Sequence, residues 1–494
     1  MLISGLVLGT VLGFVMQRGR FCVTGFLRDI FTQRSWRGFV ALLIVISVHA
    51  IGLAALTSAG VITPEYKELA PVAVIVGGVI FGLGIVLAGG CASGTWYRSG
   101  EGLIGSWIAL VFYALSAAAM KTGFLGGLQD SLKDRTVGLT SIHASLGISI
   151  WPLVIALSAL TAYLAVRYLR EEFSGPRPVT LAPRKSGLAH ILAEKPWHVY
   201  ATAAIVGVLG VIAWPLSAAT GRNDGLGITT PSSNLANYVV TGDTERFDWG
   251  VLLVLGILVG SFIAAKASGE FRLRVPDATQ GARSVVGGIF MGVGAAWAGG
   301  CTVGNGMVQT SLFSYQGWLA LASIVAGVAI AAKLWLKPSA PSLNDVPSTP
   351  STTNDTAVSA AAPVTSAATS PVSLPGSEGA GAAGTEASPL AGAFAVAPVA
   401  LLDRSVVKQE DGKLKPLGDG RYELDTVGAV CPFPLIEAKD AINKIEVGEE
   451  LVIPFDCTQA TDAIPRWAAK DGHEVTNFEQ TGEAGWTISV RRGR

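Results

Sequence analysis

The most reactive side chains of this 494-residue chain are its five cysteines, Cys22, Cys91, Cys301, Cys431 and Cys457. A thiolate is a nucleophile, and a neutral thiol is a weak hydrogen-bond donor. The five are widely spaced, odd in number and without a CxxC motif or a Cys/His cluster, so neither a metal site nor a disulfide framework is expected. Thiols in these positions suit a ligand that contains sulfur.

Cys91 and Cys301 occupy the same position in a repeated glycine pattern. The pattern occurs in residues 77–94 and again, 210 residues later, in 287–304. The Gly-Gly pair before each cysteine should break a helix, and freed backbone groups are tolerated in a membrane only where they are buried in protein or line a cavity. A new helix after each break would aim its first N–H groups at that cavity and favour an anion. The candidate transport residues are Cys91 with Gly90 and Gly94, and Cys301 with Gly300 and Gly304.

Cys22 is a third candidate for the transport path. It follows Gln17-Arg18-Gly19-Arg20-Phe21 and a short helix with glycines four residues apart. A single cysteine at a membrane interface is usually a small apolar residue, but Cys22 shares the helix–glycine–cysteine order of the other two. The stretch that would match it in the second half, residues 256–272, has no cysteine.

Cys431 stands in a different setting, Cys431-Pro432-Phe433-Pro434, directly before a predicted helix. Proline is pre-set for a first helical turn, and the helix dipole should lower the pKa of the thiol and favour thiolate. A thiolate there can attack a sulfane sulfur and hold it as a persulfide. Cys457 follows Asp456 at the end of a predicted strand, where it fits either a second catalytic thiol or a core residue.

The composition divides the chain that must position these thiols into three parts. Residues 1–337 carry 24 Lys+Arg and 15 Asp+Glu, whereas residues 404–494 carry 12 and 16. Residues 338–403 are rich in Pro, Ala, Ser and Thr, contain no Lys or Arg, and are expected to be a disordered linker. With 15% charged residues against about 25% in soluble chains, a single soluble enzyme is excluded, as are a secreted disulfide scaffold and a basic nucleic-acid-binding protein.

The first part contains nine apolar stretches, which predict about nine transmembrane segments. If every stretch crosses, the loops on one side hold 16 Lys+Arg and those on the other hold 6, which places the N-terminus outside and the C-terminal domain in the cytoplasm. A re-entrant hairpin would break this alternation. The stretches are residues 2–17, 38–59, 72–89, 103–120, 144–168, 198–218, 249–267, 283–299 and 316–336.

The expected fold is an all-α polytopic membrane protein with inverted repeats and broken helices, followed by a small two-layer α/β sandwich. The repeated cysteines end stretches of opposite direction, as in the inverted repeats of many secondary transporters. In 404–494, a hairpin near Gly418-Asp419-Gly420 and the patterns that follow predict the order β-α-β-α-β-β. No phosphate-binding GxxxxGK[ST] motif and no Asp or Glu inside an apolar stretch is present.

The Gly-Gly-Cys repeat with Cys22 resembles the YeeE/YedE-type sulfur-transport family over residues 1–337. The CPxP segment is similar to TusA-like sulfur carriers of the YeeD type over residues 415–494. The resemblance implies thiosulfate uptake in which Cys22, Cys91 and Cys301 pass the ion along by thiol hydrogen bonds without covalent intermediates. It also implies that Cys431 accepts the sulfur, and Cys457 lies outside that motif.

The expected function is therefore thiosulfate uptake across a bacterial-type inner membrane, coupled to a cytoplasmic domain that takes the sulfane sulfur as a persulfide. The expected partners are thiosulfate, membrane lipid and a cytoplasmic sulfur-acceptor protein, with no cofactor, metal or nucleic acid. Whether the C-terminal domain is an enzyme, a sulfurtransferase that decomposes thiosulfate, stays open. The alternatives are a transporter of another sulfur or selenium oxyanion, a membrane-anchored sulfurtransferase, and a redox sensor, which the wide cysteine spacing does not favour.

Overall fold

The computed structural model describes residues 2–336, 414–429 and 431–493. The predicted linker, residues 338–403, lies outside the described residues. The described residues on either side of it belong to one compact unit.

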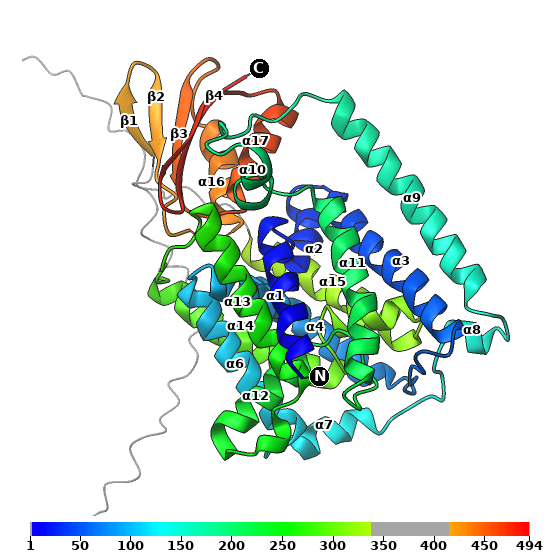
Figure 1. Ribbon diagram of the computed structural model, residues 1–494. Coiled ribbons are helices and arrows are strands. Elements are labelled where there is room, and N and C mark those ends of the chain that lie inside the picture. Colours follow the sequence, from blue (N-terminus) through cyan, green and yellow to red (C-terminus); the bar gives the residue numbers. More distant parts are fainter. Residues whose placement is uncertain (1, 337–413, 430, 494) are drawn as a thin grey trace, which may run out of the picture. The chain divides into compact units, whose positions relative to one another are not determined.

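Described residues 2–336 form helices joined by turns and loops (Figure 1). The first half has α1 (Ile3–Arg18), α2 (Val23–Thr32), α3 (Arg37–Ser58), α4 (Pro71–Leu87), α5 (Ala92–Gly100) and α6 (Ile104–Lys121). The second half has α11 (Val199–Ala218), α12 (Thr229–Thr241), the 3-10 turn η1 (Thr244–Arg246), α13 (Trp249–Ser268), α14 (Ala278–Ala298), the π-helix η2 (Gly304–Gln309) and α15 (Tyr315–Trp335). Four helices connect the halves: α7 (Gly126–Lys133), α8 (Ile142–Ser145), α9 (Trp151–Ser174) and α10 (Gly187–Ala193).

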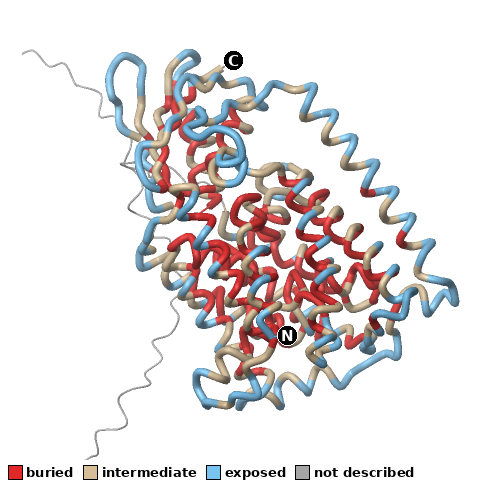
Figure 2. The backbone as a smooth tube through the Cα atoms, in the orientation of Figure 1, coloured by how far each residue is buried: buried red, intermediate tan, exposed pale blue. Residues whose placement is uncertain are grey.

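Eight helical segments of the described residues are long and apolar enough to cross a membrane, so the chain is a multi-pass membrane protein. Two of them, residues 3–32 and 71–100, are interrupted at a cysteine. The predicted stretch at 283–299 does form a helix, α14, although this helix, whose first turns are polar, is not among the eight. Along α9 only Val154 and Thr161 are buried, and Figure 2 shows it as a largely exposed helix beside the buried inner ones.

The glycine pattern of the two repeats forms the contact between α4 and α14. A Cβ added to Gly77 would lie 2.7 Å from the carbonyl oxygen of Gly294, and one added to Gly294 would lie 2.7 Å from that of Gly77. Gly84 and Gly287 are related in the same reciprocal way, at 2.8 and 2.9 Å. Because the two pairs run in opposite order along the helices, α4 and α14 are antiparallel, as inverted repeats related by a two-fold axis in the membrane plane require.

The other helices follow the same two-fold relation. Helix α4 packs on α15 and α14 packs on α6, while α1 packs on α13 and α11 packs on α3. By element order, the short helix α12 is the counterpart of α2. The expected match between residues 256–272 and the Cys22 segment is therefore wrong: Gly256 and Gly260 belong to α13 and contact the backbone of α1 itself.

The C-terminal part is a five-stranded sheet with two helices, which confirms the predicted α/β fold. Its strands are β1 (Leu414–Gly418), β2 (Arg421–Leu424), β3 (Glu450–Phe455), β4 (Glu474–Gly482) and β5 (Gly485–Arg491), in the order β1-β2-β3-β5-β4. Only the β2–β3 pair is parallel, because α16 (Phe433–Ile442) connects these strands, and α17 (Ala460–Asp471) follows β3. Alternate residues of β3 are buried and pack with the helices in one core.

Candidate functional site

Each of the three membrane cysteines stands directly before a short helix or turn. Cys22 is the N-cap residue of α2, Cys91 is that of α5, and Cys301 precedes the turn that leads into η2. Their exposed fractions are 1%, 0% and 0%. The first N–H groups of a helix have no acceptor within it, so these positions present donors as well as thiols.

The predicted glycine breaks lie where the sequence placed them. Helix α4 ends at Leu87 and α14 ends at Ala298. The first glycine of each Gly-Gly pair has a positive φ, +69° at Gly89 and +78° at Gly299, a conformation that glycine adopts without steric cost. Gly90 is buried and Gly300 half-buried, each beside the turn that carries its cysteine.

Cys22 and Cys91 lie together beside Gly94, the residue three positions after Cys91. A Cβ added to Gly94 would be 3.2 Å from the Cys91 Sγ and 3.5 Å from the Cys22 Sγ. The Cys91 Sγ is also 3.5 Å from the Ser93 Oγ. Gly94 therefore leaves open the space that two thiols face, and a side chain at this position would fill it.

Cys301 has a different set of neighbours from the other half of the chain. The Tyr113 hydroxyl of α6 donates to the Thr229 Oγ1 at 2.8 Å and also interacts with the Cys301 thiol. The Thr302 Oγ1 is fully buried and has no hydrogen-bond partner among the described residues. Next to Gly304 there is open space within 4 Å of an added Cβ. The turn after Cys301 thus combines a buried thiol with a buried hydroxyl that has no partner among the described residues.

Arg98 is a functional candidate that the sequence analysis missed. It lies on α5, is 5% exposed, and donates from its Nη1 to the carbonyl oxygen of Gly89 at the α4 break. In the sequence it was only one cation in a loop count, because the helix predicted after Cys91 gave no sign that its polar residues are buried. Its charge lies at the break that precedes Cys91.

Cys431 and Cys457 are joined by a disulfide, with their Cα atoms 6.3 Å apart. The expectation that the wide spacing discourages cysteine pairing is wrong here. Strands β2 and β3 are parallel, so the segments that follow them leave the same edge of the sheet. The Asp456 carboxylate accepts a hydrogen bond from the Gly428 N–H at 3.0 Å and holds the two segments together.

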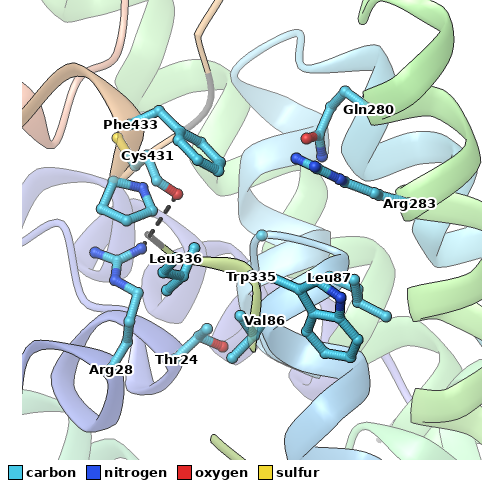
Figure 3. Close-up of a pocket in the computed structure, with 12 residues that line it drawn as sticks. Thr24, Arg28, Val86, Leu87, Gln280, Arg283, Trp335, Leu336, Cys431 and Phe433 are labelled. Atoms are coloured by element: carbon cyan, nitrogen blue, oxygen red, sulfur yellow. Dashed lines mark hydrogen bonds between the residues drawn. The ribbon is translucent and has the colours of Figure 1, made fainter. Parts of the chain in front are cut away.

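A cavity lined by Cys431 also reaches the first two membrane breaks (Figure 3). Thr24, two residues after Cys22, lines it, as does Gly89, two residues before Cys91. Arg28 of α2 donates from Nη1 to the Cys431 carbonyl oxygen at 3.1 Å, and Arg283 of α14 faces the Phe433 ring at 5.9 Å. The segments that carry Cys22 and Cys91 thus lead to the same cavity as the CPxP cysteine.

A second cavity contains both cysteines of the α/β domain together with two arginines. Its lining includes Cys431, Cys457, Arg98 and Arg274, and Arg274 donates from Nη1 to the Asp456 carbonyl oxygen at 2.6 Å. The lining residue Glu101 is 2% exposed, and this burial raises the pKa of its carboxyl to about 7. The cavity can hold an anion whose surroundings change charge near neutral pH.

Close to this cavity, Glu270 is held ionised by two arginines. Burial raises the pKa of its carboxyl, but Arg20 and Arg18, with the Gln17 amide, lower it by more, so the pKa lies below its usual value. The Arg20–Glu270 ion pair is 3.1 Å long, and Arg20 also donates to the Thr461 hydroxyl. Arg20, two residues before Cys22, is thereby linked to Thr461 of α17.

Comparison with known proteins gives two separate family matches. Residues 18–330 match the model of the sulphur transport family, and residues 422–492 match that of the sulfurtransferase TusA family. The chain is 50% identical over 328 residues to the thiosulfate transporter TsuA of Escherichia coli, which covers 66% of this chain and 93% of that protein. It is 32% identical over 342 residues to TsuA of Spirochaeta thermophila, covering 66% of this chain and 97% of that one.

The C-terminal part has relatives of its own. It is 59% identical over 70 residues to the putative sulfur carrier protein TsuB of Escherichia coli, which covers 14% of this chain and 93% of that protein. Two separate proteins of that organism are thus similar to the two parts of this one chain. With its family models, its membrane spans and its small α/β domain taken together, the chain is a multi-pass member of the sulphur transport family that carries a TusA-type sulfur-carrier domain.

Proposed function

We propose that the chain takes up thiosulfate through a path lined by Cys301, Cys91 and Cys22 and delivers it to Cys431, which keeps the outer sulfur as a persulfide. In this proposal residues 1–337 are the transport domain, 338–403 a linker and 404–494 the carrier domain. The N-terminus lies outside and the carrier domain in the cytoplasm. The names of the two TsuA relatives support the substrate.

The observation that carries the proposal is the pair of cavities that Cys431 lines. One is shared with Thr24 and Gly89, which flank the first two membrane cysteines, and the other with Arg98 and Arg274. In this proposal, an ion that leaves the breaks meets the carrier thiol in a cavity lined by arginines.

The membrane path has the properties that a dianion needs. An unpaired charge at bilayer depth is costly, and thiols, hydroxyls and helix N-terminal N–H groups can replace part of its water. Neutral thiols donate weakly, so each site holds the ion without trapping it, as passage through successive sites requires. Gly90, Gly94, Gly300 and Gly304 keep side chains out of these turns.

The capture step balances without a cofactor. The Cys431 thiolate attacks the outer sulfur of thiosulfate, the S–S bond of thiosulfate breaks, and sulfite leaves with the bonding electron pair. The products are a Cys431 persulfide anion and sulfite, with the same total charge as the reactants. Arg98 and Arg274 neutralise part of the three negative charges that come together in this step. Consuming the ion at its exit draws further ions inward.

The test is uptake of thiosulfate labelled in its outer sulfur by proteoliposomes that contain the full chain, with excess sulfate as competitor. We expect saturable uptake that resists sulfate and label that becomes bound to the protein. Cys301→Ala should abolish uptake with the protein intact, whereas Cys431→Ser should abolish only the bound label.

Two results would contradict the proposal, and each supports one of the alternatives. Sulfite formation without any uptake would identify a membrane-anchored sulfurtransferase. Uptake that selenate or sulfate suppresses as well as thiosulfate does would identify a transporter of another oxyanion.

A further inference from the structure

We propose that Cys457 is a resolving cysteine, which releases the sulfur held on Cys431 as hydrosulfide and leaves a Cys431–Cys457 disulfide that a dithiol reductant must reopen. This inference rests on the proposed capture of sulfur by Cys431. It assigns a second chemical step, a released product and a co-substrate class to the carrier domain.

The first support is the geometry of the pair. The Cα atoms of Cys431 and Cys457 are 6.3 Å apart and the two sulfurs are bonded. This separation lies inside the range of about 4.4–6.8 Å that a disulfide requires. The Cys457 sulfur therefore reaches the Cys431 sulfur without movement of the backbone, which gives the intramolecular reaction a large advantage over a thiol from solution.

The second support is that the protein itself fixes both flanking segments. The Gly428 N–H donates to the Asp456 Oδ1 at 3.0 Å, which joins the segment before Cys431 to the residue before Cys457. The Thr426 Oγ1 donates to the Pro454 carbonyl oxygen at 2.9 Å. Arg274 holds the Asp456 carbonyl oxygen at 2.6 Å. These contacts do not involve the sulfurs, so they do not require the disulfide.

The third support is the space around the pair. Cys431 is 8% exposed and Cys457 7% exposed, so a persulfide here is shielded from bulk thiols. Both line the cavity that also contains Arg98, Arg274 and Ser106. Positive charge beside a cysteine favours its thiolate, and the same charge can receive the anion that leaves. The cavity thus provides an attacking thiolate and a place for the product.

The step is a thiol–disulfide exchange at the inner sulfur of the persulfide. The Cys457 thiolate attacks the Cys431 Sγ, the bond between this atom and the outer sulfur breaks, and the outer sulfur leaves as hydrosulfide with the persulfide proton. A dithiol then reduces the disulfide and is itself oxidised. In sum, thiosulfate and a dithiol give sulfite, hydrogen sulfide and a disulfide. Structural disulfides are rare in cytoplasmic proteins, which agrees with a bond that opens in each cycle.

The experiment uses the full chain in detergent, reduced, freed of reductant and mixed with excess thiosulfate. Sulfite and sulfide are measured separately, and the cysteine peptides are examined by mass. The wild type should form one sulfite and one sulfide per chain and end with the Cys431–Cys457 disulfide. Adding a dithiol should then start repeated turnover.

Cys457→Ser should still form one sulfite per chain, which also shows that the variant is folded, but its sulfide should fall at least tenfold. Its Cys431 peptide should carry the extra sulfur. Cys457→Ala should behave in the same way, because both changes remove the attacking thiol. Cys431→Ser should form neither product.

The outcomes separate the two proposals. If the wild type forms no sulfite, the capture step is wrong, and with it the proposed function. If the wild type forms sulfite and Cys457→Ser releases sulfide at the wild-type rate, capture stands and the resolving role is overturned. Extra sulfur found on Cys457 of the wild type, with no disulfide, would overturn it as well, since Cys457 would then be a second carrier.

Discussion

Cys91 and Cys22 present two thiols to the space beside Gly94, and in the proposed path the side chain at each position determines which hydrogen bonds the ion can receive. A thiol and a hydroxyl both donate, whereas a methyl group does not. Hydroxyl groups bind more tightly than thiols, so a serine keeps recognition and slows release.

Replacing Cys91 should separate recognition from release. We expect Cys91→Ala to lower the rate of thiosulfate uptake at least tenfold, and Cys91→Ser to lower it less while also lowering the KM. Initial uptake rates in proteoliposomes over a range of thiosulfate concentrations measure both effects.

Ser323→Ala is a matched control, because its buried hydroxyl bonds only to its own helix, at the Leu319 carbonyl oxygen 2.8 Å away. It should leave uptake unchanged. Equal loss in Cys91→Ala and Ser323→Ala would mean that general packing, and not the thiol, is what uptake needs.

Glu101 should make the capture of sulfur depend on pH. Burial raises the pKa of this carboxyl to about 7, so it is protonated below that pH and ionised above it. An ionised Glu101 repels a dianion in the shared cavity and opposes Arg98 and Arg274, and Glu270 adds to this repulsion. The KM for sulfite formation should therefore rise between pH 6 and pH 8, and Glu101→Gln should flatten this rise.

The matched control is Glu245→Gln, which removes an exposed carboxylate that does not line the cavity. The pH profile of this variant should follow that of the wild type. A wild-type KM that is flat across this range would refute the role of Glu101.

Glu101 should also make the stability of the protein depend on pH. The pKa of its carboxyl in the folded state lies above the ordinary 4.5, so its contribution to the free energy of unfolding is present at low pH and is lost as the pH rises through about 7.

The residue scale also shows the limits of prediction from sequence. The thiols and the glycines of the repeat were recognisable because type and spacing recur at a fixed offset. Arg98, Tyr113 and Arg274 were not, since each is a single polar residue whose partners come from distant segments. The Cys431–Cys457 pair was missed because only the parallel pairing of β2 and β3 brings the two residues together.

At the scale of elements, the α4–α14 crossing depends on glycine. A Cβ at Gly77 would lie 2.5 Å from the backbone nitrogen of Ala298, which cannot give way as a flexible side chain can. Gly77→Ala should therefore lower the free energy of unfolding by about 1–3 kcal/mol, the usual cost of overpacking. Thermal unfolding of the full chain in detergent measures the loss.

Gly281→Ala is the matched control on the same helix pair. Gly281 lies in α14, with nothing within 4 Å of an added Cβ. This change should leave the free energy of unfolding unchanged or raise it by up to about 1 kcal/mol, because alanine has a higher helix propensity than glycine. Similar destabilisation by both changes would show that the crossing does not depend on close backbone contact at Gly77.

Element prediction succeeded where hydropathy is strong and failed where buried helices are polar. The long helices were predicted by their apolar runs, and the breaks by Gly-Gly-Cys. Helix α12 begins Thr229-Thr230-Pro231-Ser232-Ser233 and was placed in a loop. The hydroxyls of Thr229, Ser232 and Ser233 are nevertheless buried, and the Trp96 Nε1 donates to the Ser232 Oγ at 2.9 Å. A buried hydroxyl-rich helix has the composition of a loop, so only the structure distinguishes them.

At the scale of the whole molecule, charges join α17 to the membrane helices. Arg466 donates to Glu172 of α9 at 2.8 Å, and Arg37 lies 3.2 Å from the same carboxylate. Half-buried pairs of this kind contribute on the order of 1 kcal/mol or less each. Pairs of this strength can orient the α/β domain on the membrane helices and can still break and re-form.

Reversing one of these charges should slow the proposed transfer of thiosulfate to Cys431 without unfolding either domain. Arg466→Glu places its carboxylate beside those of Glu172 and Asp462, so we expect sulfite formation by the full chain to slow several-fold at low salt and less at high salt. Arg491→Glu is the matched control, because Arg491 pairs with Glu474 inside the α/β domain at 3.1 Å. If both variants slow the reaction equally, the effect belongs to the stability of the carrier domain and not to its docking.

In the proposed cycle, the cavity shared by Cys431 and Cys457 is both the end of the ion's path and the place where the ion is consumed. A path without an energy source of its own conducts in both directions, and consumption of the ion on one side makes the net flow inward. In this cycle the consuming group is one pair of sulfurs, which is either reduced or oxidised. When the supply of reducing equivalents falls, the pair stays oxidised, and uptake ends once the ion has equilibrated across the membrane. Accumulation of the sulfur would then follow the reducing capacity of the cell without a separate regulator.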